Sequence, residues 1–393
     1  MHNIVKDIPL WSVTIWDKNF SGVDRNWQPR TIKYKYLLSD ELDQINIGGD
    51  VCLLYTGKDI GFTNEQLAGD ALCEGEIVSI PWGGTPSVKY YNGRFVTGDN
   101  RIATSSKPEE LLNKYLYYYL KGHLREISSY YRGAGLKHPS MKDVLKMTIS
   151  YPDIDTQKRI IAQFEHLERV ISLREQEINR FDELIKARFV EMFGDILHES
   201  KYPSVQLNEL VDIGSSKRIF ANEYVQEGIP FYRSKEIREL GSGMKPSVEL
   251  FISPERYNDI RRKFGVPRVG DILIAAIGAT IGYSWIVNTD SPFYYKDGNL
   301  ILLSLKDRVN PVFLNHAMGI LIEDFKSKGV AGSAQLALTI EKLEKMTVVN
   351  PEIELQKKFA EFVKQVDKSK SVVQKSLDEA QLLFDSLMQE YFG

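Results

Sequence analysis

The sequence predicts an α+β protein with a pseudo-two-fold internal repeat, in which two β-rich globular segments alternate with two long helices. Three observations support this prediction. The chain has 393 residues, 43% of them hydrophobic, which suits two to three domains with cores of their own. One region of the sequence recurs farther along the chain, and each copy ends in a long apolar pattern of helical spacing. No stretch reaches about eighteen apolar residues, so we expect no membrane span.

The first globular segment is expected at residues 1–150. The run from Gly49 to Gly57 places a Gly-Asp pair before apolar residues, which is typical of a turn that leads into a buried strand. Aromatic and β-branched residues between Ile77 and Ile102, interrupted by Gly, Pro and Asn, predict further strands. A helix from Pro108 to Tyr131 is expected to close the segment.

The repeat begins near the end of this segment. Residues 133–158 align without a gap over residues 332–357, a displacement of 199 positions, and the register holds to the Phe-Gly pair that ends each copy. Each copy predicts a short strand that ends at a proline, followed by a long helix. The identical residues include Lys146-Met147-Thr148 and Lys345-Met346-Thr347, Pro152 and Pro351, Gln157-Lys158 and Gln356-Lys357, and Phe193-Gly194 and Phe392-Gly393.

The first long helix is expected in residues 151–199. Its apolar residues advance by alternating steps of four and three, which is the spacing of the buried positions in a coiled coil. Two arginines, Arg174 and Arg188, interrupt this seam. The apolar seam residues are Ile160, Phe164, Leu167, Ile171, Ile178, Phe181, Ile185 and Met192.

The second globular segment is expected at residues 200–349. The run from Gly270 to Gly278 again places a Gly-Asp pair before apolar residues and predicts a second buried strand. Residues Tyr283 to Leu305 predict further strands, and Pro311 to Lys328 predicts a closing helix. The two segments therefore share a β-rich organisation.

The second long helix is expected in residues 350–393, with a seam that only Lys370 interrupts. The charged interruptions fall at different levels of two seams of about 33 residues each, so we expect the helices to pack on each other with a register tuned by these charges. The alternative is that each helix packs only on its own globular segment. The apolar seam residues are Phe359, Val363, Val366, Val373, Leu377, Ala380, Phe384, Leu387 and Tyr391.

Charge and cysteine content narrow the classes of function. Lys and Arg number 50 against 53 Asp and Glu, and the net charge of −3 means that any polyanion site must be local. Two cysteines, Cys52 and Cys73, together with the absence of a secretory leader at Met1–Leu10, predict a reducing, cytoplasmic location. The 6 histidines are scattered along the chain, which argues against a zinc site.

Several enzyme signatures are missing from the sequence. It has no phosphate-binding G-x-x-x-x-G-K-[ST] loop, no G-x-S-x-G elbow, and no Pro-Pro pair such as the catalytic motif of amino-group DNA methyltransferases requires. We therefore expect neither NTP hydrolysis nor methyl transfer by this chain. The triplet Asp324-Phe325-Lys326 matches the Asp-x-Lys pattern of metal-dependent nucleases, but we expect it to lie on the solvated face of a helix.

Local clusters of basic and aromatic residues are the positive signal. Arginine suits bidentate contacts with guanine, and lysine and arginine neutralise phosphates, so the clusters are candidate DNA-binding sites. The alternative for each basic residue taken alone is an ordinary solvated surface charge. The clusters, however, recur in both segments of a chain with net negative charge. The candidates are Trp82, Lys89, Tyr91, Arg94, Arg101 and Arg132 in the first segment, and Lys217, Arg218, Arg233, Lys235, Arg261, Arg262, Lys263 and Arg268 in the second.

A longer motif combines these repeated parts. It consists of Pro152-Asp-Ile-Asp-Thr-Gln-Lys-Arg-Ile160, the run from Leu173 to Gly194, and a weaker echo from Pro351 to Gly393. This motif resembles that of the specificity subunit of type I restriction-modification systems, in which a Pro-x-x-x-x-Gln-[Lys/Arg] entry leads into a long helix that ends in Phe-Gly. The resemblance covers the organisation of the whole chain, whereas the two globular segments match only in outline.

The resemblance implies that residues 1–150 and 200–349 are target-recognition domains, each binding one half of a bipartite sequence in double-stranded DNA. It implies that the helices pair as an antiparallel coiled coil that separates the domains. The specificity subunit of this family is non-catalytic, with no cofactor or metal of its own, and no membrane partner is implied. It recruits two methyltransferase subunits and, through them, restriction subunits, which are expected to bind S-adenosylmethionine, ATP and Mg²⁺.

Two other interpretations remain. In one, the chain is a nuclease or modifying enzyme with a site near Asp271 or Asp324, and it would cleave or methylate DNA unaided. In the other, the chain is a coiled-coil scaffold whose globular segments bind protein, and it would show no salt-dependent affinity for DNA.

Overall fold

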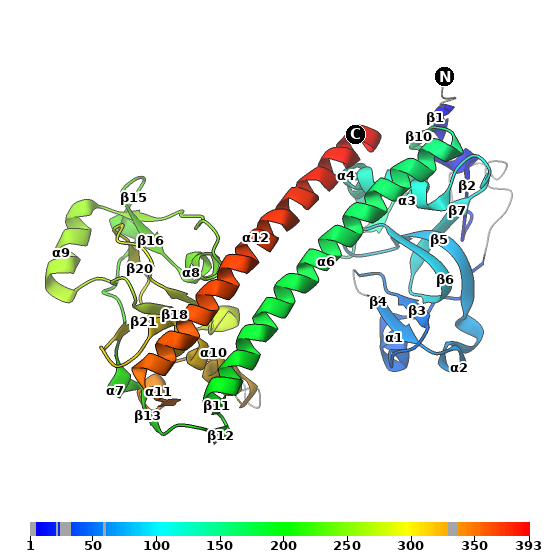
Figure 1. The fold of residues 1–393 in the computed structure, drawn as a ribbon. Coiled ribbons are helices and arrows are strands. Elements are labelled where there is room, and N and C mark those ends of the chain that lie inside the picture. The colour runs from blue at the N-terminus through cyan, green and yellow to red at the C-terminus, as the bar shows by residue number, and fades with distance from the viewer. Residues whose placement is uncertain (1–4, 21–22, 24–32, 58–59, 329–335) are drawn as a thin grey trace. The chain divides into compact units, whose positions relative to one another are not determined.

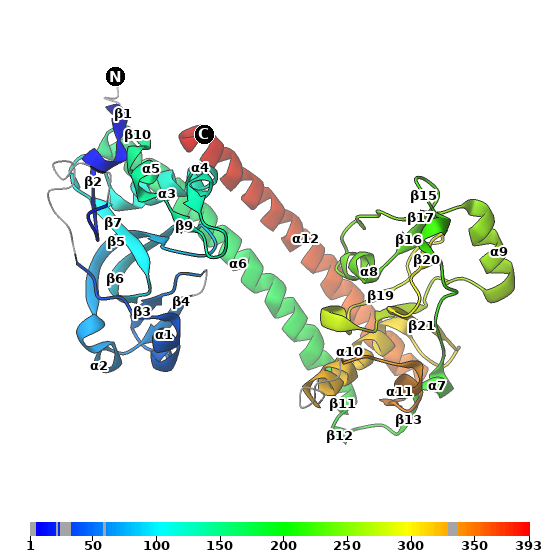
Figure 2. The same cartoon turned by 180° about the vertical axis from the view of Figure 1, so that it is seen from behind.

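The computed structural model describes residues 5–20, 23, 33–57, 60–328 and 336–393. These residues form two compact units, drawn in Figure 1 and, from behind, in Figure 2. Unit 1 comprises Met1–Glu175 with Gln374–Gly393, and unit 2 comprises Gln176–Val373. Each unit therefore contains one β-rich domain and a part of both long helices, and the predicted α+β class is confirmed.

The domain of unit 1 is built on a six-stranded sheet of order β2-β7-β5-β6-β3-β4. Strand β3 runs parallel to β6, and the other neighbours are antiparallel. All residues of β3 are buried, as the pattern between Gly49 and Gly57 predicted. The strands are β2 (Thr14–Trp16), β3 (Val51–Leu54), β4 (Ile60–Thr63), β5 (Cys73–Pro81), β6 (Lys89–Thr97) and β7 (Asn100–Ser105).

Short elements connect this sheet to the first long helix. Strand β1 pairs antiparallel with β10, the strand that precedes the helix, and β8 pairs with β9. The main core of unit 1 lies between the sheet, α3 and the start of the long helix. The elements are β1 (Val5–Pro9), α1 (Ser39–Ile45), α2 (Glu65–Ala68), α3 (Asn113–Gly122), α4 (Leu124–Ser129), β8 (Tyr131–Arg132), β9 (His138–Pro139), α5 (Met141–Lys146) and β10 (Thr148–Tyr151).

The single closing helix expected from Pro108 to Tyr131 is wrong, because the structure has α3 and α4 in its place. The backbone N–H of Leu112 donates to Gln157 Oε1 at 2.9 Å, and Gln157 Nε2 donates to the carbonyl of Glu110 at 2.7 Å. The side chain of Gln157 thus holds the residues before Asn113 in a turn, and α3 begins only after them.

Unit 2 carries two four-stranded sheets, of order β14-β21-β18-β19 and β15-β17-β16-β20, and a separate pair of β13 with β22. Strand β18 is buried throughout, as the pattern between Gly270 and Gly278 predicted. The strands are β13 (Ser204–Gln206), β14 (Val211–Gly214), β15 (Tyr224–Val225), β16 (Ile229–Tyr232), β17 (Phe251–Ile252), β18 (Ile272–Ala275), β19 (Ser284–Ile286), β20 (Tyr294–Tyr295), β21 (Leu300–Leu305) and β22 (Thr347–Val349).

The helices of unit 2 pack against these sheets and the long helices. The predicted closing helix is present as α10, with the expected bounds of Pro311 and Lys328. A short hairpin of β11 with β12 connects the first long helix to the domain. The elements are β11 (Gly194–Asp195), β12 (Glu199–Ser200), α7 (Leu207–Leu210), α8 (Ser234–Gly241), α9 (Pro254–Phe264), α10 (Pro311–Lys328) and α11 (Ile340–Glu344).

The two long helices are α6 (Ile154–Phe193) and α12 (Ile353–Phe392), and each follows a short strand that ends near a proline, as predicted. Helix α6 ends where Gly194 adopts a φ of 82°, a conformation that glycine reaches without strain. A Cβ atom there would lie 2.5 Å from the carbonyl oxygen of Glu199, so the hairpin that follows requires glycine.

The helices pair within each unit. In unit 1, the ring centroid of Phe164 lies 5.2 Å from that of Phe384. In unit 2, the ring centroid of Phe189 lies 5.3 Å from that of Phe359, and Lys370 Nζ lies 2.6 Å from Asp182 Oδ1. Early residues of α6 therefore meet late residues of α12 and the reverse, so the pairing is antiparallel (Figures 1 and 2).

All seventeen apolar seam residues are buried or half-buried, which agrees with this pairing. The buried ones are Ile160, Phe164, Leu167, Ile185, Phe359, Val363, Val366, Val373, Ala380 and Phe384, and the half-buried ones are Ile171, Ile178, Phe181, Met192, Leu377, Leu387 and Tyr391.

Candidate nucleic-acid interface

The candidate cations of the sheet in unit 1 all have polar partners. Lys89 and Arg94 project from β6, where Lys89 Nζ donates to the carbonyl of Tyr55 and Arg94 pairs with Asp50 and, at 2.9 Å, with Glu65. Tyr91, on the same strand, is half-buried and packs edge-on against Phe95, a neighbour that shields part of its ring. The carboxylates offset the positive charge of Arg94, which weakens its attraction for phosphate.

Arg101 is a structural residue of the sheet in this unit. Its side chain is almost completely buried and pairs with Asp99 and, at 3.1 Å, with Asp17. The guanidinium carbon lies 4.8 Å from the ring centroid of Trp82, whose other neighbour is the ring of His138 at 5.3 Å. Burial raises the pKa of Asp17 and Arg101 opposes that shift. The buried guanidinium of Arg101 is therefore not available to DNA in this structure, whereas Trp82 stays half-buried.

Arg132 is the candidate of unit 1 that stays exposed without a carboxylate partner among the described residues. It lies on β8, and its guanidinium donates to the carbonyls of Ser129 and, at 3.4 Å, Tyr131. The hairpin loop that follows exposes Leu136, a residue that is 63% accessible. An exposed apolar side chain suits insertion between base pairs, and no pattern in the sequence singled out Leu136.

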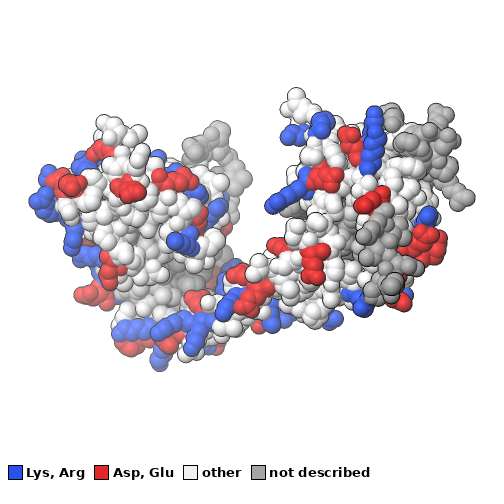
Figure 3. Space-filling view, turned by 90° about the horizontal axis from the view of Figure 1, so that it is seen from above, with Lys and Arg blue, Asp and Glu red and all other residues white. Residues whose placement is uncertain are grey.

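The basic cluster of α9 is on the surface of unit 2. Arg261, Arg262 and Lys263 are exposed in the last turn of the helix, and Figure 3 shows Lys and Arg side chains gathered over this helix at the left edge of the unit. Asp259 pairs with Lys263 at 3.0 Å and lies 3.8 Å from Arg262. Arg261 has no carboxylate partner among the described residues.

A cleft of about 830 Å³ opens next to this cluster. The loop after β14 and the loop between α9 and β18 form its walls, and Lys217, Phe264 and Arg268 line it. Lys217 Nζ lies 5.4 Å from the ring centroid of Phe264, and the backbone N–H of Lys217 donates to Tyr294 Oη at 2.6 Å. Within the described chain, no carboxylate lies within ion-pair distance of the side chains of Lys217 or Arg268. We call this feature, defined by Lys217, Phe264 and Arg268, the unit 2 cleft.

Three other candidates in unit 2 are neutralised by carboxylates. Arg218 Nε lies 2.7 Å from Asp297 Oδ2, while Arg233 and Lys235, at the start of α8, share Glu249. The cation cluster that the sequence indicated is thus divided by the fold. Carboxylates pair with Arg218, with Arg233 and Lys235 at α8, and with Arg262 and Lys263 on α9. Within the described chain, Lys217, Arg268 and Arg261 have no such partner.

The carboxylates considered for catalysis have structural partners. Asp271 is buried and accepts from the N–H of Arg268 at 2.8 Å, and burial raises the pKa of Asp271. Asp324 pairs with Lys328 on the surface of α10 at 2.7 Å. Across the described ranges, no group of three His, Cys, Asp or Glu side chains is placed to hold a metal ion, and no helix is long and apolar enough to cross a bilayer.

Two equivalent glutamines join the long helices to their domains. Gln157 and Gln356, the repeated glutamines of the sequence, are both fully buried. Gln356 Oε1 accepts from the N–H of Asn310 at 2.8 Å, just before α10, and Gln356 Nε2 donates to the carbonyl of Pro351 at 2.8 Å. Gln157 makes the corresponding bonds with the residues before α3 and with Pro152. We call these residues the helix-entry glutamines.

The long helices also expose apolar side chains outside their seam. Such residues cost free energy in water and mark surfaces for other proteins when they lie close together. Sequence reasoning missed them because it followed only the buried seam. They are Leu173, Leu184 and Val190 on α6, and Val372, Leu382 and Leu383 on α12.

A family profile and two sequence relatives all indicate the same family for this chain. A profile of the type I restriction modification DNA specificity domain matches residues 33–181 and 199–381 of this chain. A protein of Haemophilus influenzae named as a type I restriction enzyme specificity subunit is 25% identical over 239 residues, which span 58% of this chain and 59% of that protein. The MjaVIII specificity subunit of Methanocaldococcus jannaschii is 23% identical over 333 residues, or 79% of this chain and 76% of that protein.

Two solved structures share the fold. The specificity subunit of a type I restriction-modification system from M. genitalium gives a TM-score of 0.61 at 18% identity, and the match covers 100% of this chain and 96% of that one. A chain from a structure of type I restriction-modification complex assembly gives a TM-score of 0.52 at 17% identity, with 89% and 96% covered. Because the family profile matches most of both units, this chain belongs to the family of type I restriction-modification DNA specificity subunits.

Proposed function

We propose that this chain reads a bipartite target in double-stranded DNA, with one half-site for the domain of each unit. The observation that carries the proposal is the equivalence of the helix-entry glutamines. Gln157 and Gln356 are fully buried and fix the same joint between a domain and a long helix in both units. Two domains that are joined in the same way to paired helices allow one chain to bind two separate DNA segments.

The distribution of unpaired cations supports this reading. In unit 2, Lys217 and Arg268 of the unit 2 cleft and Arg261 of α9 lack carboxylate partners in the described chain, and Phe264 offers an exposed ring beside them. In unit 1, Arg132 and the exposed Leu136 lie on the β8–β9 hairpin and its loop. Unpaired cations bind phosphates with release of counterions, and apolar or aromatic side chains contact bases.

The paired helices provide the spacing in this proposal. A seam of about 33 residues at a rise of about 1.5 Å per residue is roughly 50 Å long. At about 3.4 Å per base pair, this length corresponds to roughly 15 base pairs. It suits two short half-sites and an unread spacer between them.

In this proposal, other subunits of the complex catalyse the methylation and cleavage of DNA. Specificity subunits are the non-catalytic members of these complexes, and the exposed apolar residues of α6 and α12 supply docking surfaces for helices of two methyltransferase subunits. In this proposal, restriction subunits join through the methyltransferases in the cytoplasm. S-adenosylmethionine, ATP and Mg²⁺ bind to these partners and not to this chain.

Selection from a random duplex library tests the proposal. The chain is used alone and together with the methyltransferase encoded beside its gene. We expect enrichment of a two-part motif with a fixed unread gap, which appears or tightens with the partner. No enrichment under either condition with folded protein would contradict DNA reading and favour a scaffold that binds proteins. Cleavage or methylation of DNA by the chain alone would favour an enzyme.

A further inference from the structure

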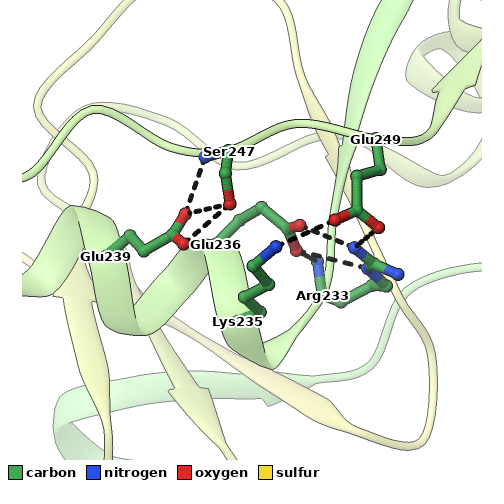
Figure 4. A network of polar contacts seen from close by, with 6 residues as sticks. All are labelled: Arg233, Lys235, Glu236, Glu239, Ser247 and Glu249. Atoms are coloured by element: carbon green, nitrogen blue, oxygen red, sulfur yellow. Dashed lines mark hydrogen bonds and ion pairs between the residues drawn. The ribbon is translucent and has the colours of Figure 1, made fainter. Parts of the chain in front are cut away.

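Two cations at the start of α8 share one exposed carboxylate. Figure 4 shows Glu249 reaching from a neighbouring segment toward Arg233 and Lys235. Glu249 Oε1 accepts from Lys235 Nζ at 2.9 Å, and Glu249 Oε2 accepts from Arg233 Nη2 at 2.9 Å. Each oxygen of the carboxylate therefore binds a different cation. The two unesterified oxygens of a DNA phosphate offer the same pair of acceptors with the same negative charge.

The position of Arg233 does not depend on Glu249. The fully buried carboxylate of Glu236 accepts from the backbone N–H of Arg233 at 2.8 Å and from its Nη2 at 2.9 Å. A carboxylate with these bonds fixes the guanidinium in place, as Figure 4 illustrates. If Glu249 moved away, Glu236 would still hold the guanidinium of Arg233 in the same direction. The N–H of Nη2 that now donates to Glu249 would be free.

The segment that carries Glu249 is anchored at other residues. Glu239 accepts from the backbone N–H of Ser247 at 2.7 Å and from its hydroxyl at 2.7 Å, and the N–H of Phe231 donates to the carbonyl of Leu250 at 2.9 Å. The side chain of Glu249 is itself 57% exposed. Rotation of this side chain into water would therefore leave the segment in place, and the cost is that of two surface ion pairs, each weak because water screens it.

We propose that Glu249 occupies the place of a DNA phosphate in the free protein and is displaced when unit 2 binds the DNA backbone. This inference rests on the proposed function. While Glu249 is in place, it and Glu236 together balance the two positive charges, so that unit 2 attracts non-target DNA less strongly. Any duplex that places a phosphate at Arg233 and Lys235 must first break the contacts with Glu249. The carboxylate thus lowers the affinity for DNA in general and reduces the number of counterions released on binding.

The test uses Glu249→Gln in the full chain, assembled with the methyltransferase. Affinity for the selected target and for a non-target duplex is measured over a series of salt concentrations. We expect binding at low salt to be about two- to fivefold tighter, because the two weak ion pairs of Glu249 no longer have to be broken. We also expect the slope of log affinity against log salt to steepen by up to about 0.9. In the wild type the displaced carboxylate takes up a cation from solution, which offsets one of the counterions that the phosphate releases.

Two further variants make the result specific. Glu227→Gln makes the same change of charge at an exposed residue of unit 2 that has no ion-pair partner within the described chain, and it should change neither quantity. Lys235→Met combined with Glu249→Gln should remove most of the gain, because one of the two freed cations is gone.

The remaining outcomes decide against the inference. An unchanged affinity and slope in Glu249→Gln would overturn it while DNA binding by the wild type upholds the proposed function. Weaker binding together with a lower unfolding temperature would show that Glu249 only fastens its segment. Absence of DNA binding by the wild-type complex would overturn the proposed function and this inference together.

Discussion

Phe193 and Phe392, the residues before the glycine that ends each repeat, occupy equivalent places in the two units. The ring centroid of Phe193 lies 4.8 Å from that of Phe313 on α10 and 5.6 Å from that of Phe359 near the start of α12. The ring centroid of Phe392 lies 5.3 Å from that of Tyr115 on α3 and 5.9 Å from that of Phe164 near the start of α6. The end of each long helix therefore packs on the start of the other helix and on the domain beside it.

Substitution of these phenylalanines should loosen one unit each. Phe193→Ala leaves a cavity between α6, α10 and α12, and we expect it to lower the free energy of unfolding of unit 2 by about 3–5 kcal/mol. Phe392→Ala should act in the same way on unit 1. Hydrogen exchange followed by mass spectrometry should show faster exchange in α10 for the first variant and in α3 for the second. Equal exchange in both units for either variant would contradict the assignment, and Phe264→Ala, at an exposed ring, is the control.

Removal of a helix-entry glutamine should destabilise the joint that it forms. Gln157→Leu keeps much of the volume but leaves the N–H of Leu112 and the carbonyl of Glu110 without their partner. We expect a loss of about 1–3 kcal/mol for this change and for Gln356→Leu, because buried polar groups without partners are costly. Thermal unfolding measures the effect. The same substitution at the exposed Gln365 of α12 should be neutral, and equal losses at all three positions would contradict a specific role.

Lys217 and Arg268 should contribute to the affinity of unit 2 for DNA. We expect Lys217→Gln and Arg268→Gln each to weaken binding and to reduce the slope of log affinity against log salt by about 0.9, because each removes one phosphate contact. In a library selection, only the half-site of unit 2 should change or disappear. Lys345→Gln, at a lysine that pairs with Glu341 on α11, serves as a control of equal charge. Loss of both half-sites together would count against separate readers.

The length of the paired helices should set the length of the spacer. Deletion of residues 174–180 from α6 together with residues 371–377 from α12 removes one heptad from each helix and preserves the phase of the seam. The pair becomes shorter by about 10 Å, or roughly 3 base pairs of DNA. The selected motif should keep both half-sites and lose that part of the gap. An unchanged gap would rule out the helix pair as the spacer.

His316 should make the stability of unit 2 depend on pH. Its ring packs on Phe359, and burial lowers its pKa below the ordinary value of 6.5, although Asp367 and Asp182 oppose the shift. The unfolded chain takes up this proton near pH 6.5, whereas the folded chain takes it up only at a lower pH. The stability of unit 2 is therefore full above pH 6.5 and decreases as pH falls below it. Between pH 7.5 and 5.5, the unfolding temperature of wild type should therefore fall more than that of His316→Gln. An equal fall in both would assign the dependence to other groups.

The elements that the sequence predicted well are those determined by local patterns. The long helices follow from apolar spacing along a single stretch, and the buried strands β3 and β18 follow from short apolar runs after Gly-Asp. The beginning of α3 was missed because it depends on Gln157, which lies 45 residues from Leu112 in the chain. No local pattern carries that information.

The roles of the candidate cations were harder to predict, for the same reason. Arg101 is neutralised by Asp17, 84 residues away, and Arg94 by Glu65, 29 residues away. A cluster of cations in the sequence does not reveal which of them the fold pairs with distant carboxylates. Lys217 and Arg268 were candidates on the same grounds as Arg101, and only the fold separates the exposed pair from the buried residue.

Unit 1 combines two stretches that are far apart in the sequence, and this determines when it can be completed during folding. Phe384 and Phe392 belong to the same core as Leu10 and Val13, although more than 370 positions separate the two groups of residues. During synthesis from the N-terminus, the domain of unit 1 emerges first, but the faces of Phe164 and Tyr115 stay uncovered until Gln374–Gly393 leaves the ribosome. The first domain to be made is thus the last to be completed, and a nascent chain stalled within unit 2 would present an apolar surface to chaperones.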